Sequence, residues 1–324
     1  MRHRLFTIFG GTGFIGRYVV SRLADRGARL RVISRSPSTH GNHLQPLGRV
    51  DQIVVQSADL SSEAALQRAV AGSAGVVNLI GILHDTRRQR FAEVQGALPG
   101  RIAAAARAEG VARMVQISAI GADPASSSAY ARSKAEGERR VLEAFPDATV
   151  LRPSIVIGPE DGFFNRFAAM ARISPVLPLI GGGHTKFQPV YVTDVAEAVA
   201  RAVDGKVAKG KIYELGGPDV LSFRDCLEIM LNTIDRKRTL VSLPFGVASF
   251  IGSIASMVPF ITPPLTPDQV VLLKSDNVVS AKAVSEGRTL AGIGIDPTML
   301  ESILPTYLVR YRPQGQYTRS GRGA

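Results

Sequence analysis

The stretch "TIFGGTGFIGRYVV", residues 7–20, decides the fold of this 324-residue chain. A short strand-like run leads directly into glycines at positions 10, 13 and 16, and a helical pattern follows. In this setting the glycines allow a tight turn, a close approach of the backbone to a pyrophosphate, and close packing of helix on strand. The helix start then favours an anion through its free N–H groups. Gly10, Gly13 and Gly16 therefore predict a dinucleotide loop, with a purely structural turn as the alternative.

Outward from this loop, strand and helix patterns alternate. Strands are predicted at 4–10, 29–35, 51–60, 74–81, 112–121 and 148–158. Helices are predicted at 16–27, 62–72, 99–110 and 133–145, and several of them end at glycine. Such alternation specifies a parallel sheet covered on both faces. The predicted fold class is α/β, a doubly wound parallel sheet with a smaller C-terminal cap.

After about residue 155 the pattern loosens. The stretch 174–190 is expected to be rich in loops, 192–204 is a helix pattern, and 210–219 returns a strand. We expect a nucleotide-binding domain over 1–221, a cap or docking region over 222–312, and a basic, glycine-rich flexible tail over 313–324. The single cysteine excludes an internal disulfide and fits a reducing compartment.

The end of the second strand bears on the choice of cofactor. NAD-binding proteins place an acidic residue there to hold the ribose 2′-hydroxyl, whereas this chain has Ser34 and Arg35. A guanidinium suits a 2′-phosphate, so NADP(H) is favoured over NAD(H); a plain surface cation is the alternative for Arg35. Asp59, after the third strand, has two interpretations of equal weight: contact with the adenine amino group, or a cap for the helix that begins near Ser61.

The pair Tyr130 and Lys134, in "YARSK", stands four residues apart and so shares one face of a helix. A lysine cation in that position can lower the pKa of a tyrosine hydroxyl and make it a proton donor. The pair alone is weak evidence, because such spacings also arise by chance.

Taken together, these features resemble the short-chain dehydrogenase/reductase superfamily in its extended and atypical branches, with a Rossmann-type fold. The features are the glycine loop, Asp59, "YARSK", "LRPSIVIGP" at 151–159 and "FQPVYVTDVAEAV" at 187–199. The chain is more closely similar to the Rossmann-type accessory subunit of respiratory complex I (NADH:ubiquinone oxidoreductase) in its bacterial form. The stretches 144–168, 185–199 and 265–280 carry that resemblance.

The resemblance implies a subunit that holds NADPH tightly, supports assembly and stability near the membrane junction, and has no redox turnover of its own. It implies a location on the cytoplasmic face of the bacterial inner membrane, with other complex I subunits as partners. It also implies a set of cofactor contacts: Gly10, Thr12, Gly13, Phe14, Ile15, Gly16, Ser34, Arg35, Asp59, Leu60, Ile80, Gly81, Ser118, Tyr130, Lys134, Pro153 and Ile155.

Two positions depart from the reductase pattern. Extended reductases carry a Ser or Thr a few residues into the loop after the fifth strand, whereas here Ser118 stands at the strand end. Their frequent Asn in the preceding helix is Gln95 here. The proton relay is therefore incomplete, and Tyr130 and Lys134 are catalytic candidates that have become vestigial under this interpretation. The alternative is a free NADP-dependent reductase or epimerase acting on a sugar-nucleotide or an isoprenoid- or sterol-like substrate.

Residues 239–267 carry no charge. Pro244 and Pro259 limit a helix to about 14 residues, too short to span a bilayer. This amphipathic helix predicts contact with lipid or a partner protein, with burial inside the cap as the alternative. The net charge of +12 favours anionic partners, and the basic tail suits anionic lipid. No nucleic-acid motif, metal-ligand cluster or signal peptide is recognised.

Overall fold

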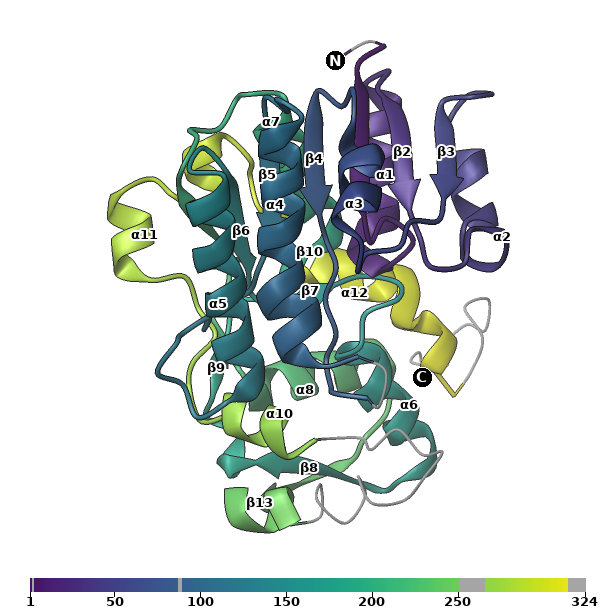
Figure 1. Cartoon of the computed structure of the whole chain (residues 1–324). Helices are drawn as coiled ribbons and strands as arrows, with labels where there is room; N and C mark the ends of the chain where they lie inside the picture. Colours follow the sequence, from purple (N-terminus) through teal and green to yellow (C-terminus); the bar gives the residue numbers. More distant parts are fainter. Residues whose placement is uncertain (2, 87–88, 251–265, 314–324) are drawn as a thin grey trace. The chain divides into compact units, whose positions relative to one another are not determined.

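The computed structural model describes the chain except for residues 2, 87–88, 251–265 and 314–324 (Figure 1). The chain forms two compact units, each assembled from three segments. Unit 1 comprises Met1–Ser154, Val192–Gly216 and Val279–Pro297, and unit 2 comprises Ile155–Tyr191, Gly217–Val278 and Thr298–Ala324. The boundary expected at residue 221 from the sequence stays a prediction.

Unit 1 is built on a seven-stranded parallel sheet, which confirms the predicted fold class (Figure 1). The strand order is β11-β6-β5-β4-β1-β2-β3. Because the chain steps from β1 towards β3 on one side and from β4 onwards on the other, the order reverses between β1 and β4. Ligands of doubly wound sheets bind outside the carboxyl ends of the strands at such a reversal. The strands are β1 (Leu5–Phe9), β2 (Arg29–Ile33), β3 (Ile53–Gln56), β4 (Gly75–Asn78), β5 (Met114–Ile117), β6 (Thr149–Pro153) and β11 (Ile212–Leu215).

Helices cover both faces of this sheet. On one face α3, α4 and α5 pack side by side, and α1 packs against α7. Residues on β4 and β5 are all buried, as expected for central strands between two helical layers. The helices of unit 1 are α1 (Phe14–Asp25), α2 (Pro37–His40), η1 (Asn42–Leu47), α3 (Glu63–Val70), the π-helical turn η2 (Ala92–Ala97), α4 (Leu98–Ala108), α5 (Ala129–Ala144), α7 (Val192–Val203), α11 (Ala281–Ser285) and η4 (Ala291–Ile293).

The edge strand β11 is covered by the last segment of unit 1. The Glu214 N–H donates to the Arg288 carbonyl over 3.0 Å, and the Ser280 N–H donates to the Glu214 carboxylate over 2.7 Å. The Arg288 guanidinium donates in turn to the Ile212 carbonyl. The segment Val279–Pro297 therefore occupies hydrogen-bonding groups that an edge strand would otherwise expose.

Unit 2 contains short strand pairs and helices around an aromatic core. Phe163, Phe164, Phe167, Phe187 and Phe223 lie with ring centroids between 5.0 and 6.3 Å apart, mostly edge to face. The strands pair as β10 with β7, β12 with β9, and β13 with β8. Its elements are β7 (Val156–Ile157), α6 (Phe164–Ile173), β8 (Val176–Ile180), η3 (Gly181–Gly183), β9 (Lys186–Phe187), β10 (Val190–Tyr191), β12 (Leu221–Ser222), α8 (Phe223–Thr233), β13 (Thr239–Leu243), α10 (Pro267–Leu272), α12 (Leu300–Leu308) and η5 (Val309–Tyr311).

Two expectations for this part of the chain need correction or lie outside the described residues. The stretch expected to be rich in loops contains β8 and β9, and the uncharged segment opens with strand β13. The helix expected between Pro244 and Pro259 falls largely on residues outside the described part, as does the basic tail. In the part of the chain that the structure describes, no helix is long and apolar enough to span a bilayer.

Candidate nucleotide site

The glycine loop joins β1 to α1 at the carboxyl edge of the sheet. Gly10 has φ of +76°, and a Cβ there would lie 3.0 Å from the Ile80 nitrogen. A Cβ on Gly16 would lie 2.3 Å from the Gly10 carbonyl oxygen, so helix and loop are in contact there. At Gly13 the nearest heavy atom would be 3.4 Å away, and this glycine is exposed. The close contacts of Gly10 and Gly16 and the open side of Gly13 match a loop that receives a phosphate on its backbone.

The start of α1 is left open for an anion. Gly13 is its N-cap residue, with no side-chain cap, and the first turn contains no acidic residue. The sequence thus leaves N–H groups at the positive end of a 12-residue helix without an internal carboxylate to neutralise them.

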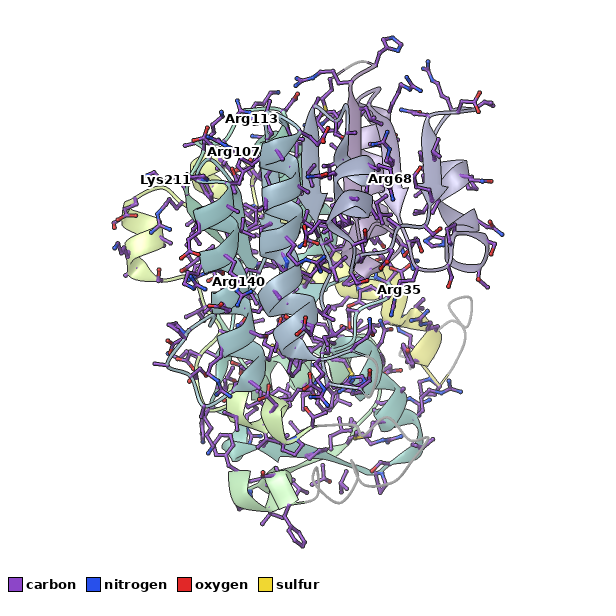
Figure 2. All side chains as sticks on the ribbon, viewed as in Figure 1. Arg35, Arg68, Arg107, Arg113, Arg140 and Lys211 are labelled. Atoms are coloured by element: carbon purple, nitrogen blue, oxygen red, sulfur yellow. The ribbon has the colours of Figure 1, made fainter. Side chains whose placement is uncertain are left out.

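The end of β2 places Ser34 and Arg35 differently. The Ser34 side chain is 7% exposed, whereas Arg35 is exposed and forms no ion pair with any residue that the structure describes. Figure 2 shows Arg35 on the side of the sheet where the strands end, away from Arg107, Arg113 and Lys211. A free guanidinium in this position can meet a phosphate group.

Asp59 resolves one of the sequence alternatives. Its carboxylate accepts hydrogen bonds from the Ser61 N–H at 2.9 Å and the Ser61 hydroxyl at 2.6 Å. Helix α3 is capped instead by Ser62, whose hydroxyl accepts from the Ala65 N–H. The interpretation of Asp59 as the helix cap was therefore wrong, and contact with adenine stays a prediction.

Tyr130 and Lys134 come from the start of α5. The buried Ser128 caps this helix by accepting from the Ala131 N–H, so Tyr130 lies in its first turn. The half-buried Tyr130 ring meets Phe91 edge to face, with centroids 5.8 Å apart. The Lys134 ammonium lies 5.7 Å from the centre of the Tyr130 ring. The predicted pair therefore shares one face of one helix.

Lys134 is a buried cation without a hydrogen-bonding partner among the described residues. Its side chain is 7% exposed, and its ammonium lies 3.4 Å from where a Cβ on Gly81 would be. Burial lowers its pKa from 10.5 to about 8, although the charge of Glu138 acts in the opposite direction. A buried ammonium that faces a glycine at the carboxyl end of β4 is suited to bind a ligand hydroxyl or phosphate.

Comparison with known proteins identifies the family of this chain. The sequence profile of the NAD dependent epimerase/dehydratase family matches residues 6–216, which cover the glycine loop, Tyr130, Lys134 and β11. The chain belongs to the NAD dependent epimerase/dehydratase family.

Sequence similarity to known proteins extends over nearly the whole chain. One from Arabidopsis thaliana, "NADH dehydrogenase [ubiquinone] 1 alpha subcomplex subunit 9, mitochondrial", is 36% identical over 95% of this chain and 78% of its own length. The "NADH-ubiquinone oxidoreductase 40 kDa subunit, mitochondrial" of Neurospora crassa is 29% identical over 96% of this chain and 80% of its own. Among solved structures, the Escherichia coli quinone oxidoreductase QOR2 has a TM-score of 0.72 at 22% identity, covering 93% of this chain and 99% of that one.

The residues of this epimerase/dehydratase member fit a dinucleotide. The glycine loop has the close contacts of a phosphate cradle, α1 begins without an acidic cap, and Lys134 is buried without a carboxylate contact. The remaining predicted contacts divide between the units. Thr12, Phe14, Ile15, Leu60, Ile80 and Pro153 lie in unit 1, and Ile155 lies in unit 2.

Ser118 and Gln95 stand at the two positions where the sequence was expected to depart from the reductase pattern. Ser118 directly follows β5, is 4% exposed, and its hydroxyl has no hydrogen-bond partner among the described residues. Gln95 lies in the π-helical turn η2, where its amide donates to the Ile82 carbonyl over 2.6 Å. Its amide oxygen is buried and also lacks a partner in the described chain.

Sequence reasoning missed a pair of amides beside the loop. Asn78 and Gln116 face each other across β4 and β5, and the Asn78 amide donates to the Gln116 side-chain oxygen over 2.8 Å. The Asn78 oxygen accepts from the Ile80 N–H at 3.2 Å, which fixes the chain next to Gly10. The available signal was a single polar residue near the end of each of two adjacent apolar strands.

Proposed function

We propose that this chain is an NADPH-holding accessory subunit of NADH:ubiquinone oxidoreductase (complex I) that supports assembly and has no turnover of its own. The observation that carries the proposal is the likeness over nearly the whole chain to proteins named as complex I subunits, at up to 36% identity. The proposed partners are the other subunits of that complex.

The preference for NADPH rests on the end of β2. No acidic side chain stands at Ser34–Arg35 to accept from a ribose 2′-hydroxyl, and the exposed Arg35 offers a cation for a 2′-phosphate. Gly13, Phe14 and Ile15 would lie against the pyrophosphate, and Tyr130 and Lys134 against the nicotinamide ribose. When bound, the nucleotide can supply a hydride, while the protein binds and orients it.

The absence of turnover is supported by Ser118. A hydroxyl that polarises a substrate oxygen must be accessible, whereas Ser118 is 4% exposed at the strand end. Tyr130 retains its neighbour Lys134, so the pair can hold a ribose without forming a complete proton relay.

A peripheral position at the cytoplasmic face of a bacterial inner membrane is part of the proposal. The chain has a net charge of +12, and Val247 and Phe250 in the uncharged segment are 46% and 67% exposed. Exposed apolar side chains combined with an excess of positive charge suit anionic lipid or a subunit surface.

Native gels of membranes and analysis of the released nucleotide test both parts of the proposal. We expect co-migration with complex I and release of NADP(H) after denaturation. Arg35→Asp should weaken NADPH binding on the order of 10–100-fold, because it replaces a charge-assisted contact with repulsion. Arg68→Asp, the same change at an exposed arginine of α3, is the matched control and should leave binding unchanged.

Several results would contradict the proposal. Release of mainly NAD(H) would contradict the proposed role of Arg35 in binding the 2′-phosphate. A protein that never migrates with a large partner would remove the subunit assignment. Oxidation of NADPH with a carbonyl substrate, abolished by Tyr130→Phe, would establish a reductase instead.

A further inference from the structure

A second buried charge lies one helical turn after Lys134 on α5. Glu138 is 4% exposed, and both of its oxygens accept from the Arg152 guanidinium, over 2.8 and 2.6 Å. Arg152 lies on β6, next to Pro153, and its remaining terminal nitrogen is 4.0 Å from Glu214. Arg152 on β6 thus holds the Glu138 carboxylate, which lies on the same helix as Lys134.

Burial of the Glu138–Arg152 ion pair carries a cost in desolvation free energy. Removing a carboxylate and a guanidinium from water costs free energy that their attraction often does not recover, and apolar side chains of similar volume commonly serve as well. Packing alone therefore does not account for Glu138. Lys134 and Glu138 are four residues apart on α5, so they share one face of the helix and Glu138 can act on the charge of Lys134.

Among the described residues, the other elements packed against α5 offer Lys134 no buried negative charge. The π-helical turn η2 contributes the neutral Gln95 and the exposed Glu93, and α4 contributes Arg101, bound to Glu63, and Arg107, placed over Phe145. Strand β5 contains no titratable residue, and β6 contributes Arg152. Tyr130, on α5 itself, has its ring 5.7 Å from the ammonium. Glu138 is the acidic group whose charge opposes the effect of burial on Lys134.

We propose that Glu138, held by Arg152, is a positioning residue of the nucleotide site: its negative charge keeps the buried Lys134 side chain in the ammonium form that donates to the nucleotide ribose. This inference rests on the proposed nucleotide binding of unit 1. Arg152 binds both oxygens of the carboxylate and so fixes its position on α5. The charge state of Lys134, and with it the pH range of tight binding, is then set by a residue that does not touch the nucleotide.

The first experiment measures Lys134 directly in the nucleotide-free protein. A ¹³C NMR titration of labelled lysine, with the Lys134 signal assigned by its loss in Lys134→Arg, gives the midpoint of its deprotonation. In Glu138→Gln the midpoint should move to lower pH, while glutamine still offers Arg152 an acceptor. Glu136→Gln makes the same change at a more exposed position of α5, bound to Arg139 and Arg140, and should leave the midpoint unchanged.

The second experiment measures NADPH affinity by fluorescence at pH 6 and pH 8. Glu138→Gln should bind about tenfold more weakly than the wild type at pH 8, because a charge-assisted hydrogen bond is lost. At pH 6, where Lys134 is protonated in both proteins, the affinities should agree within about twofold. A merely structural role of Glu138 would weaken binding equally at both pH values.

The outcomes separate this inference from the proposed function. An unchanged Lys134 midpoint in Glu138→Gln, or an equal loss of affinity at both pH values, would overturn the role of Glu138. If Glu138→Gln does not fold, the double change Glu138→Gln with Arg152→Gln removes both buried charges. Its midpoint should move in the same direction but by less, because loss of the Arg152 cation offsets part of the loss of the Glu138 charge. A wild-type protein that binds no NADPH would contradict the proposed function, whereas the NMR midpoints would still decide whether Glu138 controls Lys134.

Discussion

A buried carboxylate in unit 2 and several buried polar groups in unit 1 differ in how they are hydrogen-bonded. In unit 2 the buried Asp161 accepts from the N–H groups of Gly158, Phe163 and Asn165 and from the Tyr307 hydroxyl. In unit 1 the Ser118 hydroxyl and the Gln95 amide oxygen are buried without a hydrogen-bond partner among the described residues, and the Lys134 side chain is buried. Buried polar groups cost free energy unless they are hydrogen-bonded. The satisfied Asp161 therefore indicates a role in stability, whereas the buried Lys134 ammonium beside Gly81 indicates a ligand.

The largest effect on stability should come from unit 2. Asp161→Ala leaves four donors without their acceptor, including the tyrosine that ties α12 to the chain before α6, and should lower the free energy of unfolding by about 3 kcal/mol or more. Urea denaturation measures this loss. Asp219→Ala, at a less buried position of the same unit, should change it by less than about 0.5 kcal/mol. A loss in Asp161→Ala as small as in that control would remove the assignment of Asp161 to stability.

The next largest effect is expected in unit 1, where a substitution should stabilise the protein rather than destabilise it. Lys134→Met removes a buried charge and should stabilise the nucleotide-free protein on the order of 2–3 kcal/mol at pH 7, while it abolishes NADPH retention. Thermal unfolding with and without NADPH measures both consequences. Lys211→Met, at an exposed lysine, is the control and should do neither. Destabilisation of the nucleotide-free protein by Lys134→Met would mean that Lys134 serves the fold.

The same lysine predicts a pH dependence. Burial lowers the folded-state pKa of Lys134 to about 8, below its ordinary value of 10.5, so between these values the unfolded state binds more protons than the folded state. The penalty for burying Lys134 is therefore complete below pH 8 and disappears as the pH rises towards 10.5. The stability difference between wild type and Lys134→Met should shrink over this window. A difference that is constant with pH would show that Lys134 is not the group responsible.

The smallest expected change in the free energy of unfolding is at Ser118. Removal of a buried hydroxyl that has no partner relieves an unfavourable desolvation, so Ser118→Ala should raise the free energy of unfolding by up to about 1 kcal/mol. Denaturant unfolding at pH 7 measures it. If Ser118→Ala instead destabilises the protein by more than about 1 kcal/mol, Ser118 has a partner in solution and the contrast with Asp161 fails at this position.

The sequence predicted unit 1 better than unit 2 for a physical reason. The glycine loop and the alternation of strands of four or five residues with amphipathic helices are local patterns, and they fix a parallel sheet. Strands such as β9 and β12 are two residues long, too short to show a period, so the stretch around Phe187 was expected to be a loop. Their pairing depends on contacts between residues far apart in the chain.

Within the site, the sequence placed side chains but could not assign their partners. Gly10, Tyr130 and Lys134 follow from spacing, because a turn or a helix fixes their relation. The helix expected to begin near Ser61 begins at Glu63 with Ser62 as its cap, and propensity does not resolve a boundary to that precision. The role proposed for Glu138 depends on Arg152, 14 residues away on a strand, and no local pattern joins them.

The cover over β11 has a consequence for synthesis on the ribosome. Strand β11 forms the sheet edge, yet the residues that hold its outer groups, Ser280 and Arg288, are translated more than sixty residues later. A nascent chain that stops near residue 221 contains every strand of the sheet but leaves that edge open to pair with another chain. Such a fragment, although it includes every residue proposed to contact the nucleotide, should aggregate during expression unless residues 279–297 are supplied.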